Sequence, residues 1–150
     1  MTLYLEDLEP GQHWTSVGRT VTETDVVNFA GLSGDFNPIH LDAVAAGDGI
    51  FGQRVVYGVL GIAMATGFLD SLGLFKGSMR AMLAIQDWRF AGPIFIGDTI
   101  HLELTIESVR PTSKGDAGVV NRRLQLVNQT GDVVQDGHIP VLILRRSVAA

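Results

Sequence analysis

The sequence contains no cysteine among its 150 residues. This absence excludes a disulfide framework, a thiolate nucleophile and a cysteine-based metal site. A cysteine-free chain fits the reducing cytoplasm, so we expect a cytoplasmic protein, although such a chain is compatible with any compartment.

Long apolar runs and clusters of basic residues are also missing. The longest uncharged stretch, Val55 to Leu69, is interrupted by three glycines, whereas a membrane span needs about 20 mainly apolar residues. The first residues carry acids early and lack the apolar segment of a signal peptide. With 11 Lys and Arg against 16 Asp and Glu, the formal net charge is -5, and no basic cluster offers a surface for nucleic acid. We expect neither membrane nor nucleic-acid partners.

The sequence is instead rich in apolar residues. Hydrophobic residues make up 46% of the chain and charged residues 18%, which is enough apolar surface for a substantial core and excludes intrinsic disorder. A length of 150 residues is ordinary for one domain and leaves little room for a second. We therefore expect a single domain over residues 1–150.

Helical signals fill the first half of the chain. Thr22 is typical of an N-cap followed by acids, and the pattern after it indicates a helix that ends at Gly34. A second short helix is expected over Asp42 to Ala46. The segment from Tyr57 to Leu72 is apolar nearly all round, which predicts a helix that is buried on every side.

Strand signals fill the second half. Ile100 to Glu107 alternates without a fault between apolar and polar residues, as a half-buried strand does. Further strands are expected over Ser78 to Phe90, Val119 to Val127 and Val133 to Leu144, and Pro140 in the last one implies a bulge or an edge position. Helices first and antiparallel strands afterwards predict an α+β fold, with a long central helix wrapped by a sheet.

The densest run of polar and special residues is Ser33 to His40, with the letters SGDFNPIH. Pro38 prevents a continuous helix, and a turn there would place His40 beside Asp35. A carboxylate and an imidazole held together form a general acid/base pair. The spacing alone favours a structural interpretation, with a helix-capping Asp, a turn and a His bonded to the backbone, because isolated Asp/His pairs are common. His13, His101 and His138 have no metal-site spacing, so we expect no metal.

The run Ser33 to His40 resembles the signature of the MaoC-like (R)-specific enoyl-CoA hydratases, a branch of the hotdog-fold superfamily. Val55 to Leu60 and Trp88 to Asp98 resemble further segments of that family. The resemblance implies a hotdog fold, in which a curved antiparallel sheet wraps a long helix, and a homodimer or higher homo-oligomer. It also implies a substrate whose acyl chain is carried on coenzyme A or acyl carrier protein, and no separate cofactor.

The resemblance also assigns roles to individual residues. Asp35 and His40 would grip the water that adds across the 2,3 double bond, and the backbone N–H of Gly58 would stabilise the thioester oxyanion. Asn37 would stabilise the turn. Thr66 matches a position near the catalytic carboxylate, where the alternative is a residue that only packs. Tyr57 departs from the family, which often has His there, and would leave Asp35 and His40 untouched while altering substrate contacts.

Two other functions remain open at this point. A hotdog thioesterase would direct water at the thioester carbonyl instead of the double bond. A non-catalytic acyl-thioester-binding module would keep the fold alone. The presence of both Asp35 and His40 favours the hydratase, because binding does not require that pair.

Overall fold

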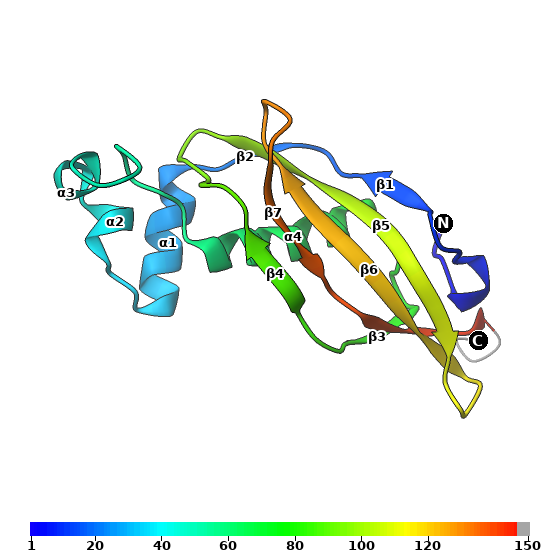
Figure 1. The fold of residues 1–150 in the computed structure, drawn as a ribbon. Coiled ribbons are helices and arrows are strands. Elements are labelled where there is room, and N and C mark those ends of the chain that lie inside the picture. Colours follow the sequence, from blue (N-terminus) through cyan, green and yellow to red (C-terminus); the bar gives the residue numbers. More distant parts are fainter. Residues whose placement is uncertain (147–150) are drawn as a thin grey trace.

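A computed structural model describes residues 1–146 and shows an antiparallel sheet with one long helix against it (Figure 1). The elements in chain order are η1 (Leu5–Asp7), β1 (His13–Thr15), β2 (Arg19–Thr20), α1 (Glu23–Ser33), α2 (Pro38–Leu41), α3 (Ala43–Gly47), α4 (Gly58–Leu72), β3 (Met79–Met82), β4 (Gln86–Phe90), β5 (Thr99–Pro111), β6 (Ala117–Val127), β7 (Val133–His138) and β8 (Val141–Leu144). The helices α1, α2 and α3 lie together at one end of the sheet (Figure 1). This arrangement confirms the predicted α+β fold.

The sheet is built on the long hairpin of β5 and β6. Its strand order is β1-β5-β6-β7-β4, with β2 also on β5 and with β8 joining β3 to β6. The alternation predicted for the first long strand is present, because Leu102, Leu104 and Ile106 are fully buried while the residues between them are half-exposed. Strands of this kind are stabilised by the apolar face that they bury.

Two predicted strands are each divided in two. The segment Ser78 to Phe90 contains β3 and β4, which pair with different neighbours: β3 with β8 and β4 with β7. The segment Val133 to Leu144 is interrupted at Ile139 and Pro140, which separates β7 from β8. Proline has no N–H for the ladder, so a strand ends or bends where it occurs.

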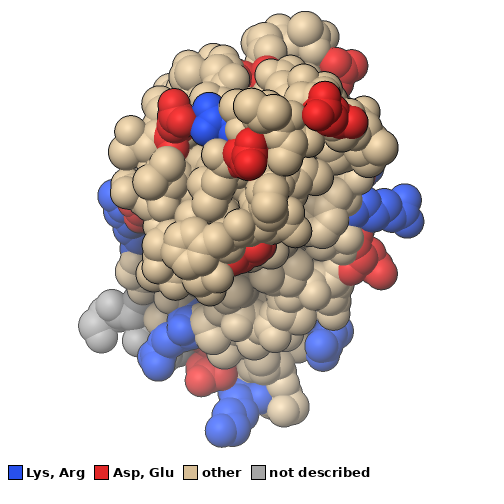
Figure 2. All heavy atoms as spheres, turned by 90° about the vertical axis from the view of Figure 1, so that its left-hand side faces the viewer, with Lys and Arg blue, Asp and Glu red and all other residues tan. Residues whose placement is uncertain are grey.

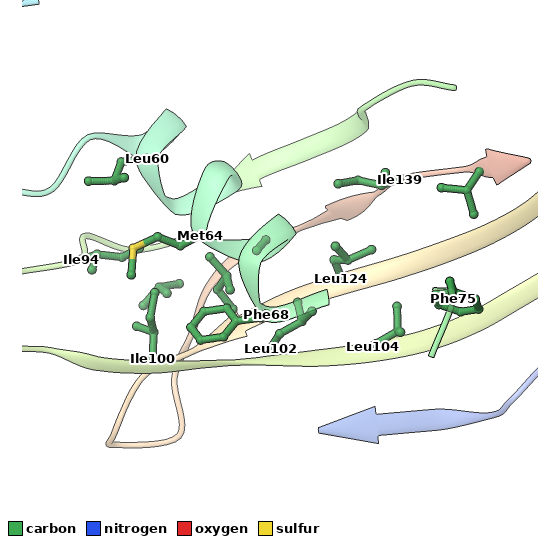
Figure 3. Close-up of a cluster of buried hydrophobic side chains, with 14 of the residues drawn as sticks. Leu60, Met64, Phe68, Phe75, Ile94, Ile100, Leu102, Leu104, Leu124 and Ile139 are labelled. Atoms are coloured by element: carbon green, nitrogen blue, oxygen red, sulfur yellow. The ribbon is translucent and has the colours of Figure 1, made fainter. Parts of the chain in front are cut away.

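The long helix α4 is not buried on every side, which corrects the prediction. Its residues Leu60, Met64 and Phe68 face the sheet and pack against apolar side chains of β5 and β6 (Figure 3). The opposite face is open, and Val59 is 60% exposed there. The sheet covers one side of the helix and no other described element covers the rest, so an all-apolar sequence leaves an exposed apolar face.

The helices at the end of the sheet begin and end largely where the sequence predicts. Thr22 accepts a hydrogen bond from the N–H of Asp25 at the start of α1, and Gly34 ends that helix in the left-handed conformation, with φ 74°. Asp42 is the N-cap of α3. The short helix α2 was not predicted; it begins at Pro38, a residue suited to the first helical position. None of the helices within residues 1–146 is long and apolar enough to cross a membrane.

Candidate functional site

The turn between α1 and α2 is held by its own side chains. An Asp35 carboxylate oxygen accepts from the N–H of Asn37 at 3.1 Å, and the Asn37 side-chain oxygen accepts from the N–H of Ile39 at 3.1 Å. Asn37 adopts an extended conformation before Pro38 and is the N-cap of α2. Asp35 and Asn37 are both exposed, so this turn presents the Asp35 carboxylate at the surface of the single chain.

The imidazole of His40 is fixed in position and in tautomer. Its Nδ1 lies 2.7 Å from the carbonyl oxygen of Val55, which can only accept, so Nδ1 carries the hydrogen. The neutral ring then has Nε2 as its proton acceptor. The ring also stacks on Tyr57, with 3.7 Å between the centroids. A half-buried His with one nitrogen anchored and the other available is suited to act as a general base.

Tyr57 contacts both members of the predicted pair, which corrects the expectation that it leaves them untouched. Its hydroxyl donates to the carbonyl oxygen of Asp35 at 2.5 Å. Its ring stacks on the ring of His40, and its centroid lies 5.0 Å from that of the Phe29 ring. Tyr57 is only 3% exposed, so it is a core residue beneath the site. Burial raises the pKa of Tyr57, the negative charge of Asp35 adds to the rise, and the hydroxyl remains a donor at neutral pH.

Gly58 is the first residue of α4, where backbone N–H groups have no acceptor within the helix. Its lack of a side chain also has a packing reason, because a Cβ there would lie 2.7 Å from Cε1 of Phe90. The structure therefore gives this glycine a packing role in addition to the oxyanion role that the resemblance implies. The N-terminus of α4 also carries a partial positive charge that favours an oxyanion.

The two hydrogen bonds that connect Gly58, Gln135 and Trp88 were not predicted from the sequence. Gln135 on β7 donates from Nε2 to the carbonyl of Gly58 at 3.0 Å, and its Oε1 accepts from Nε1 of Trp88 at 3.1 Å. Gln135 is 2% exposed and faces the core. The sequence contains one indication of this contact: Gln135 follows Val134 within a predicted strand, at a position where a polar side chain facing the core would need hydrogen-bond partners.

His40, Gly58 and Gln135 line one cavity of about 350 Å³. Its wall is otherwise mainly apolar; the remaining lining residues are Val55, Val56, Val59, Phe90, Gly92 and Ile94. An apolar cavity with a few convergent polar groups is typical of a small-molecule site. Asp35 does not line this cavity, and it is connected to it through Tyr57.

Thr66 is placed elsewhere. Its hydroxyl donates to the carbonyl of Ala63 at 2.7 Å, and it lines a second cavity of about 320 Å³. The structure therefore brings together His40, Tyr57 and Gly58, with Asp35 joined through Tyr57, and it separates Thr66 from them.

The other histidines lie against carboxylates. His13 and His101 both contact Glu103, and His138 contacts Glu107. Within residues 1–146 no group of three His, Cys, Asp or Glu side chains is arranged to hold a metal ion. The end of the molecule that carries α1 to α3 shows scattered acidic and basic side chains without a large basic cluster in the view of Figure 2.

Comparison with protein families and with curated proteins gives consistent matches. The family described as MaoC like domain matches residues 7–128. An (R)-specific enoyl-CoA hydratase of Rhodospirillum rubrum is 34% identical over 112 residues, 74% of each chain. A 3-hydroxybutyryl-CoA dehydratase of Methylorubrum extorquens is 30% identical over 98% of this chain and 88% of that protein. Protein MaoC of Klebsiella aerogenes is 41% identical over 68% of this chain, but the chain spans only 30% of that protein's length.

Solved structures give the same fold. A protein from Archaeoglobus described as a monoamine oxidase regulatory protein superposes with a TM-score of 0.89 at 35% identity, over 96% of this chain and 95% of its own. The MaoC-like dehydratase from Rhodospirillum rubrum superposes with a TM-score of 0.83 at 30% identity, over 96% and 98%. A Mycobacterium tuberculosis protein with a double hotdog fold, 19% identical, superposes with a TM-score of 0.83 over 96% of this chain and 44% of its own. The hotdog fold is thereby confirmed.

Proposed function

The chain belongs to the family of MaoC-like domains, and from this premise we propose that it hydrates trans-2-enoyl-CoA thioesters to (R)-3-hydroxyacyl-CoA or catalyses the reverse dehydration. One observation carries the proposal. The anchored imidazole of His40 lines the same cavity as Gly58, whose backbone N–H stands at the N-terminus of α4. A base and an oxyanion donor in one apolar cavity are what addition of water to a conjugated thioester requires.

In the proposed reaction a water molecule lies at the mouth of the cavity, between Nε2 of His40 and the exposed carboxylate of Asp35, which does not itself line the cavity. Nε2 of His40 takes a proton from the water as its oxygen bonds to C3, and the electron pair of the double bond moves toward the thioester oxygen. The N–H of Gly58 and the dipole of α4 stabilise the negative charge on that oxygen. The proton then passes to C2, which restores His40 and completes the addition of water. No electrons are exchanged with a cofactor, and coenzyme A enters as part of the substrate.

A homodimer is part of this proposal. Strand β4 has β7 as its one neighbour in the described sheet, and its other edge is open for pairing. Large apolar side chains are exposed along β3, β4 and the segment between them: Met79, Met82, Leu83, Ile85 and Phe90. A second copy that continues the sheet at β4 would cover these residues. Sedimentation equilibrium is expected to give twice the chain mass of 16.1 kDa.

An assay with purified protein and trans-2-enoyl-CoA esters tests the reaction. The conjugated enoyl absorbance should disappear and an (R)-3-hydroxyacyl product should form. Asp35→Asn and His40→Gln should each lower turnover about 100-fold or more, because each removes a general acid or base. His13→Gln is the matched control, since His13 lies on β1 and pairs with Glu103 away from the cavity. Near wild-type turnover by His40→Gln would overturn the assignment of the base.

The same assay separates the other functions. Release of free thiol without loss of the double bond would identify a thioesterase. Binding of a saturated acyl-CoA without any turnover would identify a binding module. We place the proposed reaction in the cytoplasm, as the cysteine-free sequence led us to expect.

A further inference from the structure

Arg122 is a charged residue on the core side of the sheet. It lies on β6 between the buried residues Val120 and Leu124, and it is itself only 2% exposed. Burial lowers the pKa of Arg122 to about 10, so the side chain still carries its positive charge at neutral pH. A buried charge is costly unless a partner compensates for it.

The protein supplies little of that compensation. A guanidinium group has five N–H donors. The Nε–H of Arg122 donates to the carbonyl of Ile139 at 3.1 Å, and among residues 1–146 no acceptor engages the four N–H groups on its two terminal nitrogens. The group also lies over the ring of Phe75, at 5.4 Å from the ring centroid. No ion pair of Arg122 occurs in the described part of the chain.

The guanidinium group of Arg122 lies beside a cavity. Arg122 lines the cavity of about 320 Å³ that also contains Thr66, Leu69 and Met82 in its wall. The wall is mostly apolar, so the cavity offers room for an aliphatic chain and a cation at one side. A buried cation with unmatched donors beside such a cavity is the arrangement that binds a carboxylate.

The exposed face of α4 connects this cavity with the one that His40 lines. Val59 lines the His40 cavity, whereas Thr66 and Asp70 line the Arg122 cavity. Val59, Ala63, Thr66 and Asp70 are all exposed and follow at spacings of four, three and four residues, so they share one face of the helix. Thr66 lies about 12 Å beyond Gly58 along the helix axis. An acyl chain whose thioester is at Gly58 can thus reach the Arg122 cavity along this face.

We propose that Arg122 recognises a carboxylate at the distal end of the acyl chain, so that the substrates include thioesters of medium-length dicarboxylic acids. The inference rests on the proposed function, because it places the thioester of the substrate at Gly58. The planar guanidinium would bind the carboxylate through two parallel N–H···O hydrogen bonds. A chain that ends in a methyl group would leave these donors unmatched in the cavity.

The other charges around the Arg122 cavity have opposite effects on the binding of an anion. Lys76 also lines it and favours an anion, whereas Asp70 and the C-terminal end of α4 disfavour one. With two cations and one carboxylate in the wall, the balance of side-chain charge favours the anion. The competing occupant is solvent, because a cavity of this size also has room for water that could satisfy the guanidinium.

The test compares two trans-2-enoyl-CoA substrates of equal chain length, one ending in a carboxylate and one in a methyl group. The wild-type protein should show the higher kcat/KM for the carboxylate. Arg122→Met should lower that preference at least about tenfold, since hydrogen bonds to charged groups are the strong ones. Arg122→Lys keeps the positive charge but cannot form two parallel hydrogen bonds to the carboxylate, so it should lose part of the preference. Arg123→Met is the matched control, because Arg123 is the next residue on β6 but points to the other face and pairs with Asp136.

A binding measurement separates this inference from the proposed reaction. Calorimetry with a saturated ω-carboxyacyl-CoA, which cannot be hydrated, should show weaker binding to Arg122→Met than to the wild type. Hydration of the methyl-ended substrate with no preference for the carboxylate would overturn the inference and leave the hydratase intact. Arg122-dependent binding without hydration of either substrate would support the carboxylate site and overturn the reaction. If Arg122→Met fails to fold, Arg122→Lys carries the comparison, and an unchanged preference in it and in binding would overturn the inference.

Discussion

The central sheet and the helical arm, which we define as residues 23–47 with α1 to α3, are held by different forces. In the sheet, strands β5 and β6 pair from Pro111 and Gly118 to His101 and Val127. Most of their inward side chains are fully buried. The arm is mostly exposed, but Val26 and Ala30 anchor α1 in the hydrophobic core. The turn and α2 are held mainly by polar contacts, among them those of Tyr57 with Asp35 and of His40 with Val55.

Because of this difference, the sheet contributes mainly to stability and the arm mainly to the proposed chemistry. Buried apolar area in the sheet supplies the larger share of the folding free energy, whereas a turn such as that of Asp35 and Asn37 buries little. Functional groups on an exposed arm can contact substrate, and their orientation depends on a small number of hydrogen bonds. Mutations in the two regions should therefore have different effects, and four experiments test this.

The largest effect on stability is expected from Leu124→Ala in the sheet. Leu124 is fully buried on β6, and such a truncation removes apolar contacts and leaves a cavity. The free energy of unfolding should fall by about 2–5 kcal/mol in urea denaturation. Turnover per folded molecule should persist, because Leu124 does not line the His40 cavity. Leu32→Ala in the arm, where Leu32 is 83% exposed, is the control and should change neither quantity. Equal losses in the two variants would refute the contrast between the regions.

The next effect is expected at Gln135, which joins the sheet to the first turn of α4. Gln135→Met removes the partner of the Gly58 carbonyl and of the Trp88 N–H. Leaving buried polar groups unmatched should lower the free energy of unfolding by about 1–3 kcal/mol. Turnover should fall as well, since the first turn of α4 loses a contact that orients it. Gln125→Met, on the solvent-facing side of β6, is the control for both measurements. Loss of stability with unchanged kcat would show that Gln135 only holds the core together.

A smaller effect on stability is expected from Tyr57→Phe. This change deletes the hydroxyl that donates to the Asp35 carbonyl but keeps the ring stacked on His40. Stability should fall by about 1 kcal/mol, and turnover should fall about tenfold because the turn is less well placed. The pKa of Tyr57 is raised, so its contribution to stability is present below the ordinary tyrosine pKa and is lost as the pH rises through the raised value. Tyr4→Phe should change neither turnover nor this alkaline dependence.

The smallest effect is expected from Asp136→Asn, which removes an ion pair on the outer face of the sheet. Arg123 donates two hydrogen bonds to Asp136, at 3.0 and 2.6 Å, and lowers the pKa of that carboxyl. The pair is partly exposed, so its loss should cost no more than about 1 kcal/mol. A lowered pKa means that this stability is present above the ordinary aspartate pKa and is lost as the pH falls. The difference between wild type and variant in urea midpoint should therefore shrink on acidification, and an unchanged difference would contradict the assignment.

Local patterns in the sequence were sufficient for much of the fold. The alternation from Ile100 to Glu107 predicted β5, and Thr22 and Gly34 predicted both ends of α1. The division of the last predicted strand at Pro140 was foreseen only as a bulge or an edge. The apolar pattern of α4 showed that the helix is in the core but not which face the sheet covers, because a pattern without a polar side has no direction.

The sequence by itself determined the elements and the residue types in the turn from Ser33 to His40, since periodicity, capping and turn chemistry act between neighbours in the chain. Only the tertiary structure decided that Tyr57 joins Asp35 to His40, that Gln135 supports Gly58, and that Arg122 faces a cavity. These contacts connect residues that are far apart in the sequence. Which of them form depends on how the strands and α4 pack together, and no local pattern contains that information.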